Sequence, residues 1–407
     1  MAEKRSTILQ IIPELDTGGA ELSTIEIADA IERAGGRAIV LSEGGRLVQR
    51  LRDTGAQLQF FPAAAKAPWR LIWNARRIAR VIRRDKVDLI HARSRAPAWS
   101  ALIAARLTGV PFVTTYHGAY SEKSALKRLY NSVMARGDKV IANSHYTADL
   151  VRMRYGTPLA RLQVAHRGID EARFDPQLIA PERVASLRAA WGVDRDARII
   201  LNTARLTTWK GQGVLIEAVR FLTEQGQLGN AVLILAGDDQ GRSGYRAGLV
   251  AAIKSAGLED RVRLVGHVDD IPAALMAAHV AVVASIEPEA FGRAATEAQA
   301  MGTPIIATDI GAPPETVLSP PRFGPDSATG WLVPPSDPEK LASAIAAALA
   351  LSPEQRARMG ARARAHVLAS FSLTAMKQKT LEVYDALLGT NLAQSGARIT
   401  GRSAPED

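Results

Sequence analysis

The chain has 407 residues, 47% of them hydrophobic and 23% charged, which is typical of a globular protein with two or three domains. It has no cysteine, which excludes disulfides, thiol nucleophiles and zinc–thiolate sites, and it lacks the roughly 20-residue apolar run of a membrane span. The net charge is +10, and eleven basic residues lie between Lys66 and Arg106 against only Asp85 and Asp88. We therefore expect a cytoplasmic protein with an anionic partner.

Predicted strands and helices alternate from the N-terminus onwards. The first strand is expected at residues 8–15, and because Pro13 and Glu14 break its apolar run, it does not look like a signal peptide. Further strands of the first half are expected at 37–42, 57–62, 87–93, 111–118, 139–144 and 162–170. A long helix is predicted from about Trp69 to Arg84. This alternation indicates right-handed βαβ units and a parallel sheet.

A stretch with prolines and charges, about 174–196, interrupts this rhythm before it restarts. Strands of the second half are expected at 197–206, 231–237, 261–266, 280–285, 304–311 and 330–334. The predicted fold class is therefore α/β, with two Rossmann-like, doubly wound parallel-sheet domains facing a central cleft. The expected bounds are 1–175 for the first domain, 176–196 for a linker, 197–371 for the second domain, 372–389 for a helix that packs back on the first domain, and 390–407 for a disordered tail.

The stretch "TARLTTWKGQG" places two cations in one strand-to-helix turn. Arg205 and Lys210 lie between a strand that ends at Ala204 and a helix that opens near Gln212. Cations beside a helix N-terminus favour phosphate, although the Walker A spacing is absent. The alternative interpretation is a solvated surface turn, and this turn alone does not decide between the two.

The stretch "SIEPEAFGRAATEAQAMG" places two carboxylates around a strand-to-helix loop. Glu289 lies at the loop–helix junction and Glu297 lies further along the helix. Ionised carboxylates only accept hydrogen bonds, which suits the vicinal hydroxyls of a sugar, and Gly292 lets backbone approach a ligand closely. Helix-dipole compensation by Glu289 and solvation of Glu297 explain the same pattern equally well.

Four weaker signals complete the survey. Gly18 and Gly19 join the first strand to its helix, without the G-x-G-x-x-G of a dinucleotide oxidoreductase, and His117 ends a strand. A lone histidine is more often structural than catalytic. The Asp-x-Asp at 194–196 precedes a strand and is interpreted as solvated charge, and the acidic loop 237–241 lacks metal-ligand spacing, so no metal site is expected.

Taken together, these motifs resemble those of retaining glycosyltransferases of the GT-B fold, in the large family numbered 4. The resemblance runs from about residue 7 to 388, and its specific part is the pair of patterns R-L-x-x-x-K-G and E-x7-E. The residues that carry it are Gly18, Gly19, His117, Arg205, Lys210, the stretch "LVGHVDD" at 264–270, Glu289 and Glu297.

The resemblance implies a catalytic set of His117, Arg205, Lys210 and Glu289. Arg205 and Lys210 would clamp the diphosphate of a nucleotide sugar, and Glu297 would accept from the ribose hydroxyls. The implied donor-binding set is Gly18, Gly19, Arg205, Lys210, Gly266, Val268, Asp270, Glu289, Ala290, Phe291, Gly292, Arg293 and Glu297. The implied reaction retains the anomeric configuration and needs neither a metal nor another cofactor.

The partners are expected to be a nucleotide-diphosphate sugar and a glycan or lipid-linked acceptor of a bacterial envelope. "GHVDDIP" favours GDP-mannose, because an Asp carboxylate can accept from guanine, and a UDP-sugar is the alternative. The rival functions are a nucleotide-sugar epimerase and a non-catalytic nucleotide-sugar-binding protein. A nucleic-acid binder is not expected, since no base-stacking platform or recognition motif is found.

The basic helix 69–86 has two equally supported interpretations. Arg76, Arg80, Arg83 and Arg84 are predicted to share one broad face, while Trp69, Ile72, Ala79 and Ile82 fill another. Such a helix could rest on an anionic membrane, which would make the protein peripheral on the cytoplasmic face of the inner membrane. Equally, it could be a core helix with a solvated arginine face.

Overall fold

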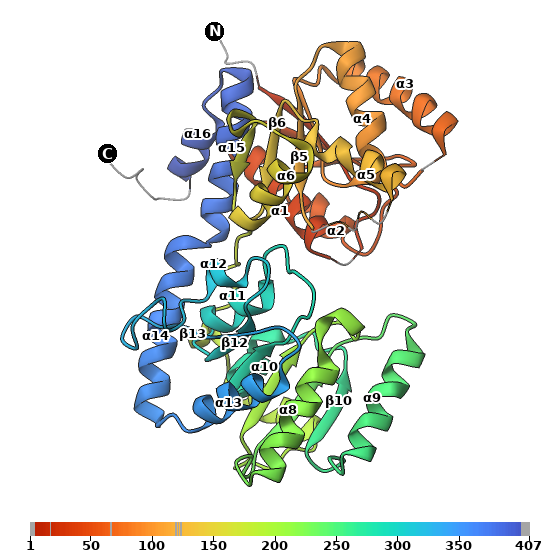
Figure 1. Ribbon diagram of the computed structural model, residues 1–407. Helices are drawn as coiled ribbons and strands as arrows, with labels where there is room; N and C mark the ends of the chain where they lie inside the picture. Colours follow the sequence, from red (N-terminus) through yellow and green to blue (C-terminus); the bar gives the residue numbers. More distant parts are fainter. Residues whose placement is uncertain are drawn as a thin grey trace. The chain divides into compact units, whose positions relative to one another are not determined.

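The computed structural model describes residues 5–16, 18–65, 67–118, 120, 122 and 124–399, and the side chains up to residue 396. Lys66 of the predicted basic segment and residues 400–407 of the predicted tail lie outside these described residues. The chain forms two compact units, Met1–Gly168 with Thr374–Asp407 and Ile169–Leu373 (Figure 1). Each unit is built around its own parallel sheet.

The first unit contains a seven-stranded sheet in the order β3-β2-β1-β4-β5-β6-β7, with every pairing parallel. The strands are β1 Thr7–Ile11, β2 Arg37–Ser42, β3 Gln57–Phe60, β4 Leu89–Ala92, β5 Phe112–Tyr116, β6 Lys139–Ala142 and β7 Leu162–Val164. The helices are α1 Gly19–Arg33, α2 Val48–Arg52, α3 Pro68–Asp85, α4 Arg95–Thr108, α5 Ala125–Asn131 and α6 His145–Tyr155. Successive strands are added on one side of β1 up to β3 and on the other side from β4 onwards, so the strand order reverses between β1 and β4, which is the switch point of a doubly wound sheet.

The second unit repeats this plan with six strands in the order β10-β9-β8-β11-β12-β13. The strands are β8 Ile199–Thr203, β9 Val232–Ala236, β10 Val262–Gly266, β11 Val280–Val283, β12 Ile305–Thr308 and β13 Gly330–Val333. The helices are α7 Pro181–Ala190, α8 Gln212–Glu224, α9 Ser243–Ser255, α10 Ile271–Ala277, α11 Arg293–Ala300, α12 Pro313–Thr316, α13 Pro338–Leu349 and α14 Pro353–Ser370. The predicted fold class of two Rossmann-like parallel-sheet domains is confirmed.

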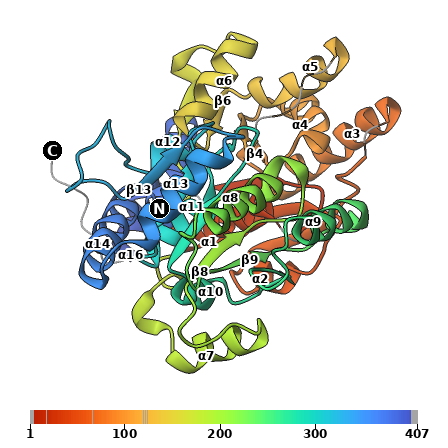
Figure 2. The ribbon, with the colours of Figure 1, turned by 60° about the horizontal axis from the view of Figure 1, so that its bottom comes forward.

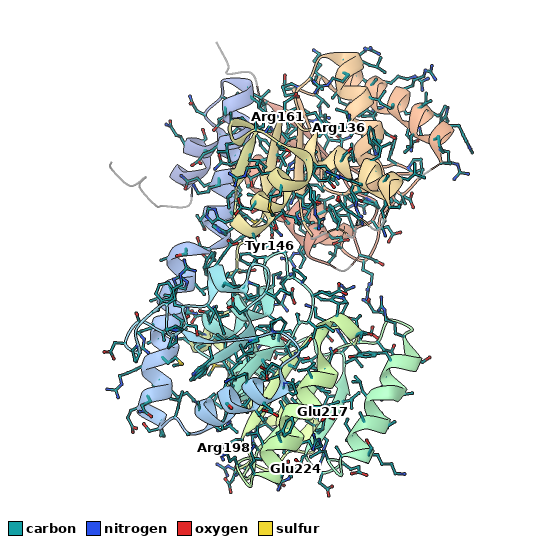
Figure 3. All side chains as sticks on the ribbon, in the orientation of Figure 1. Arg136, Tyr146, Arg161, Arg198, Glu217 and Glu224 are labelled. Carbon is teal, nitrogen blue, oxygen red and sulfur yellow. The ribbon has the colours of Figure 1, made fainter. Side chains whose placement is uncertain are left out.

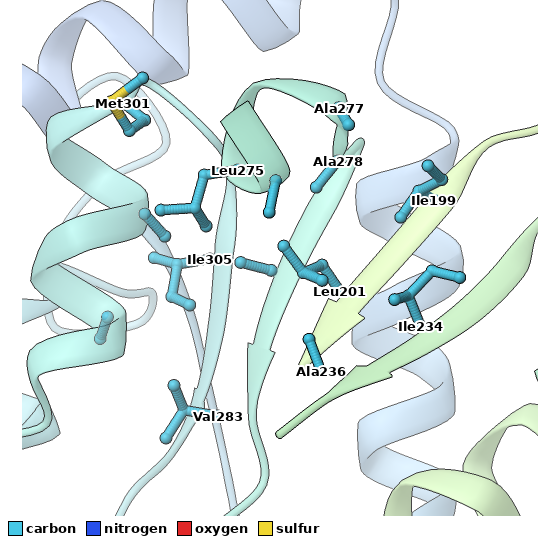
Figure 4. Packing of buried hydrophobic residues seen from close by; sticks show 14 of the residues in the cluster. Ile199, Leu201, Ile234, Ala236, Leu275, Ala277, Ala278, Val283, Met301 and Ile305 are labelled. Atoms are coloured by element: carbon cyan, nitrogen blue, oxygen red, sulfur yellow. The ribbon is translucent and has the colours of Figure 1, made fainter. Parts of the chain in front are cut away.

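Both faces of the second sheet are covered, which explains its continuous apolar strands. Because side chains alternate along a strand, Ile199 and Leu201 pack into one buried cluster, whereas Ile200 packs into another on the opposite face. Figure 4 shows the first of these clusters, which contains Leu201 of β8 and Ile305 of β12. The strands therefore fix where the loops at their carboxyl ends begin.

The surface of the second unit carries the expected charged helix faces. On α8, Arg220 pairs with Glu217 at 2.9 Å and with Glu224 at 2.5 Å, and both glutamates are labelled in Figure 3. At the start of β8, Arg198 donates to the carbonyl of Leu349 at the end of α13, 2.7 Å away. Exposed ion pairs of this kind contribute at most about 1 kcal/mol each.

The segment predicted as a linker belongs to the second unit. Residues 176–196 include a 3-10 turn at Pro176–Leu178 and helix α7, and Trp191 and Val193 are buried in the core. Pro176 and Pro181 occupy the first positions of these helical segments, where a missing N–H costs nothing. The prolines thus start helices, and the unit boundary lies at residue 168 instead of 175.

The C-terminal segment returns to the first unit. Helix α15, Leu373–Leu388, begins at the last residue of the second unit, and Lys377 pairs with Asp29 of α1 at 2.7 Å. The predicted disordered tail at 390–407 is wrong for its first part, since Leu392–Ile399 forms α16, which contacts α1. Asp385 accepts from the N–H groups of Leu392 and Ala393 and so starts this helix.

None of the helices in the described ranges is long and apolar enough to cross a membrane. Helix α3 has 18 residues, but six of them are arginines.

Candidate functional site

The turn after β8 is held in place by backbone packing. Leu206 N–H donates to the carbonyl of Asp238 at 3.0 Å, which ties this turn to the loop after β9. Gly211 has φ 71°, and a Cβ there would lie 1.8 Å from the Ala284 carbonyl oxygen at the end of β11. Only glycine fits this position, so the turn lies directly against the neighbouring strand end.

The buried side chain of Gln212 holds the same turn through hydrogen bonds. Its amide nitrogen donates to the carbonyl of Arg205 at 2.9 Å, and its amide oxygen accepts from Tyr245 Oη at 3.1 Å. Thr207 is buried, and its Oγ1 has no hydrogen-bond partner within the part of the chain that the structure describes. An unpaired buried hydroxyl is costly unless something supplies a partner, which makes this turn a candidate ligand site.

Lys210 and Glu289, predicted separately, are brought together by the fold. Lys210 Nζ lies 2.5 Å from Glu289 Oε1, and the two side chains are only 17% and 11% exposed. The same carboxylate oxygen accepts from Ser285 Oγ at 2.5 Å, and the ammonium also lies 4.2 Å from the centre of the Trp209 ring. The result is a largely desolvated cation that lies against a carboxylate and an aromatic ring, and the carboxylate is itself held by Ser285.

Glu289 is fixed through its backbone as well as its carboxylate. It forms a parallel bridge to Gly311, and its carbonyl accepts from the N–H of Ala312 at 2.9 Å. A Cβ on Gly311 would lie 2.4 Å from the Glu289 carbonyl oxygen, so glycine is required for this contact. The loops after β11 and β12 are therefore joined at Glu289.

The loop before α11 combines a buried aromatic anchor with a paired carboxylate on the helix. Gly292, with φ 80°, precedes α11, while Phe291 is buried against Phe371 at a ring distance of 5.8 Å. Glu297 accepts from Arg293 Nη2 at 2.6 Å and is 12% exposed, so it is neither a solvated residue nor a freely projecting acceptor. Its partner Arg293 is itself among the predicted donor residues, as is Ala290 in the same loop.

Arg205 is the exposed member of the predicted anion site. Its guanidinium contacts the Gln240 side chain at 3.3 Å, from the loop 237–241 that follows β9. Lys210 is matched by Glu289, whereas within the described ranges Arg205 forms no ion pair with a carboxylate. A ligand at this turn would therefore meet one exposed cation and one desolvated cation.

Most of the predicted residues in the stretch 264–270 have structural roles in the second unit. Gly266 ends β10 at a register shift with φ 74°, and Val268 is buried in the core. Asp270 caps α10 by accepting from Ala273 N–H, and Arg183 of α7 holds it through two contacts of 2.7 and 2.8 Å. The hydrogen bonds from Arg183 hold the pKa of Asp270 below its usual range.

In the first unit, Gly18 and Gly19 open α1, as the sequence predicts. Gly18 has φ 156°, and the carbonyl of Gly19 accepts from Arg167 Nη2. A Cβ on Gly19 would lie 2.4 Å from Arg167 Nη1, so a larger residue here would have to displace the guanidinium of this buried arginine. Sequence reasoning missed Arg167, which lies in the stretch "AHRGID" after β7.

His117 follows β5 and lies in a buried basic environment. Burial, reinforced by Arg93 and Arg167, holds the pKa of His117 well below its usual value, so its ring is neutral. Neither ring nitrogen has a hydrogen-bond partner among the residues that the structure describes. A neutral imidazole with unused donor and acceptor positions can bind a hydroxyl.

Arg93, also missed by sequence reasoning, lies at the end of β4 and is 2% exposed. Its guanidinium donates to Ser23 Oγ of α1 and to Thr115 Oγ1 of β5, and burial lowers its pKa to about 10. Thr115 also contacts His91 Nε2 at 2.7 Å, and His91 Nδ1 lies 2.7 Å from Tyr384 Oη of α15. In the sequence, the stretch "LIHARS" could have indicated these residues, because an ordinary core strand does not end in His and Arg.

No cluster of three or more potential metal ligands occurs among the residues that the structure describes.

Comparisons with known proteins agree with the two-unit division. The model described as "Glycosyltransferase Family 4" matches residues 17–173, and the model "Glycosyl transferases group 1" matches residues 184–366. The chain is 33% identical over 271 residues to a D-inositol 3-phosphate glycosyltransferase of Kineococcus radiotolerans, covering 65% of this chain and 61% of that protein. It is 31% identical to the protein of the same name from Saccharomonospora viridis, covering 73% and 69%.

Solved structures give the same result over nearly the full chain. A glycosyltransferase from Rickettsia africae has a TM-score of 0.86 and 33% identity, with 96% of this chain and 100% of that chain covered. HepE of Anabaena, solved in complex with UDP and glucose, has a TM-score of 0.79 and 26% identity, with 94% and 100% covered. These likenesses confirm the GT-B type of fold.

Proposed function

Because this chain belongs to glycosyltransferase family 4, the group 1 glycosyltransferases, we propose that it transfers a hexose from a nucleotide-diphosphate sugar to an acceptor hydroxyl. The observation that carries this proposal is the cluster of Arg205, Lys210 and Glu289 at the carboxyl ends of β8 and β11. Ligands of doubly wound sheets bind at these strand ends. In this proposal the two cations bind the diphosphate, and Glu289 accepts from hydroxyls of the transferred sugar.

The proposed reaction retains the anomeric configuration and requires no metal ion. As the bond from the sugar to the diphosphate breaks, negative charge grows on the leaving group and positive charge on the sugar. Lys210, held in place before the reaction by Glu289, which in turn accepts from Ser285, would stabilise the leaving diphosphate without reorganisation. The neutral ring of His117 would bind a sugar hydroxyl, and Gly19 would allow close approach of the α1 backbone. Proton NMR of the product's anomeric centre tests retention.

We propose a UDP-hexose as the first donor to test and GDP-mannose as the second. The preference for guanine comes from the two aspartates of "GHVDDIP", and of these Asp270 caps α10 and is held by Arg183. Of this stretch, Asp269 has the exposed carboxylate, with its side chain 97% accessible. HepE, at 26% identity, was solved with UDP and glucose, which supports a uridine donor.

For the acceptor we propose a glycan, a glycolipid or a phosphorylated polyol of bacterial envelope synthesis. The relatives from Kineococcus and Saccharomonospora are named for an inositol phosphate. Arg93 and Arg167 are buried cations close enough to His117 to lower its pKa, and in this proposal they suit an anionic group on the acceptor.

The test is the thermal stabilisation by UDP, GDP and ADP, each with EDTA present. A nucleotide at about 100 times its Kd should stabilise the protein by about 2.7 kcal/mol, which is roughly 5–10 °C in Tm for a unit of this size. We expect one nucleotide to act selectively and EDTA to leave its effect unchanged. If none of the three raises Tm, the nucleotide-sugar proposal is wrong.

The same preparation separates the two rival functions. A nucleotide-sugar epimerase would convert its substrate without an acceptor, and a non-catalytic binding protein would turn nothing over with any acceptor. The proposed transferase releases nucleoside diphosphate in proportion to an added acceptor. The family membership favours the transferase over both rivals.

A further inference from the structure

The exposed face of α3 differs from the one expected. Trp69, Trp73, Arg76 and Arg80 follow a spacing of four, three and four residues, which places them along one line of the helix. The buried face consists of Asn74, Ala75, Ile78, Ala79 and Ile82. The prediction that Trp69, Ile72, Ala79 and Ile82 share one face is therefore wrong, because Ala79 and Ile82 are buried whereas Trp69 and Ile72 are exposed to solvent.

The apolar end of this face is exposed to an unusual degree. Trp69 is 67% exposed, Ile72 50% and Trp73 53%. The guanidinium of Arg70 lies 4.9 Å from the Trp69 ring, and that of Arg77 lies 4.6 Å from the Trp73 ring. Large apolar side chains are normally buried, so three exposed ones within five residues indicate a surface for a partner.

The other end of the face is strongly basic. Helix α3 has six arginines, while Asp85 is its only carboxylate and is 2.7 Å from Arg84 Nη2. Arg76, Arg80 and Arg83 are exposed on the same side as the two tryptophans. The helix thus presents apolar side chains near its N-terminus and positive charge along the rest of one face.

Helix α5 adds a second set of exposed apolar groups. Leu126 is 80% exposed and Leu129 is 54% exposed, and Lys127 and Arg128 lie between them. Figures 1 and 2 both show α5 next to α3. Successive residues of α4 contact both helices, because Trp99 Nε1 donates to the carbonyl of Tyr130 and Ser100 Oγ donates to the carbonyl of Leu71.

We propose that these exposed residues of α3 and α5, here called the docking face, bind the surface of an anionic lipid bilayer. The apolar members, Trp69, Ile72, Trp73, Leu126 and Leu129, would enter the boundary between headgroups and acyl chains. The arginines of α3 would lie at the level of the lipid phosphates. Tryptophan favours this boundary, and each basic residue near an anionic membrane contributes about fivefold to binding.

The positive charge of the docking face favours an anionic lipid surface over an apolar protein partner. An apolar protein partner would leave five arginines of α3 without an acid on the helix, whereas anionic lipids supply a phosphate for each. The proposal does not depend on the transfer reaction, because lipid binding needs neither donor nor acceptor.

The test is co-sedimentation of the full chain with phosphatidylcholine vesicles, with and without phosphatidylglycerol. We expect binding only to the anionic vesicles, and strong weakening at about 1 M salt, where the Debye length is about 3 Å. The double variant Arg76→Glu with Arg80→Glu should reduce the partition coefficient by at least about 25-fold. Arg246→Glu with Lys254→Glu, exposed residues of α9 in the second unit, changes the net charge equally and should bind as the wild type does.

A second pair of variants tests the apolar members. Trp69→Ser with Ile72→Ser should abolish the binding that survives high salt and reduce the blue shift of tryptophan fluorescence on adding vesicles. Met153→Ser with Leu159→Ser replaces two equally exposed apolar residues of the same unit and should change neither. Because all these side chains are exposed, unfolding is not the expected cause of a loss.

Three results would overturn the proposal. The first is a wild-type protein that ignores anionic vesicles at low salt, and the second is binding of the α3 variants at wild-type strength. The third is a dimer in analytical ultracentrifugation that the Trp69→Ser and Ile72→Ser variant converts to monomer without any lipid binding, which would make the docking face an interface between two copies.

Discussion

Lys210 and Glu289 illustrate at the residue scale how two ambiguous signals become one site. In the sequence each has a plain alternative, a solvated lysine or a helix-capping carboxylate. In the structure they form a largely buried pair with Ser285 as a third member. Burying such charges costs several kcal/mol per ion, so stability alone gives little reason to place them at a strand end.

We predict that Lys210→Ala lowers kcat roughly 10²-fold or more, because a preorganised cation at the leaving group is lost. The measurement is the steady-state rate of nucleoside diphosphate release at saturating donor. Lys254→Ala, an exposed lysine of α9, is the matched control and should keep wild-type kcat. Near-normal turnover of the Lys210 variant would remove Lys210 from the catalytic set.

At the scale of elements, α10 depends on Asp270 for its start. The carboxylate accepts from Ala273 N–H and is held by Arg183 of α7, so one side chain joins two helices. These contacts account for Asp270 without any nucleotide. A role in selecting the base is therefore a separate hypothesis that can be tested.

We predict that Asp270→Ala costs about 1 kcal/mol, which corresponds to about 2–4 °C in Tm for a unit of this size, because the helix cap is lost. Asp270→Asn retains a capping oxygen and should cost less. Neither change should alter which nucleotide stabilises the protein. A switch in preference between GDP and UDP in both variants would instead assign base selection to Asp270.

A proline determines where α7 begins, and helical spacing determines which residues of α3 share a face. Pro181 starts α7, although its surroundings have the composition of a linker. On α3 the period of 3.6 residues places Trp69 with Arg76 and Arg80, and only the position of the sheet tells which side of the helix is inside.

At the scale of the whole molecule, a buried hydrogen-bond chain connects α15 to the first sheet. Tyr384 contacts His91, which contacts Thr115, and all three side chains are buried. Burial holds the pKa of His91 well below its usual value, so the ring stays neutral in the folded protein. In the unfolded chain the same ring takes up a proton below about pH 6.5.

We predict that the first unit loses stability as the pH falls below about 6.5, because the unfolded state then binds more protons than the folded state. Each histidine that stays neutral would contribute up to about 2 kcal/mol of loss at pH 5. Urea denaturation at pH 7.5, 6 and 5 measures this dependence.

His91→Asn is the informative variant for this prediction. It should be less stable than the wild type at pH 7.5, because the contact to Tyr384 is weakened, but its stability should fall less with pH. An unchanged pH dependence would show that His91 is not one of the groups responsible.

The sequence by itself determined the two parallel-sheet units, because apolar strands and amphipathic helices are encoded by local periodicity. It also determined that Arg205, Lys210 and Glu289 lie at the carboxyl ends of strands, since the turn or loop that carries each of them follows a strand. Only the tertiary structure decided that Lys210 pairs with Glu289 and that the carboxylate of Asp270 accepts from Arg183. The same holds for Arg93 and Arg167, which lie close to His117. These contacts join residues from 24 to 87 positions apart, or depend on which side of a helix faces a sheet, and neither property has a local signature in the chain.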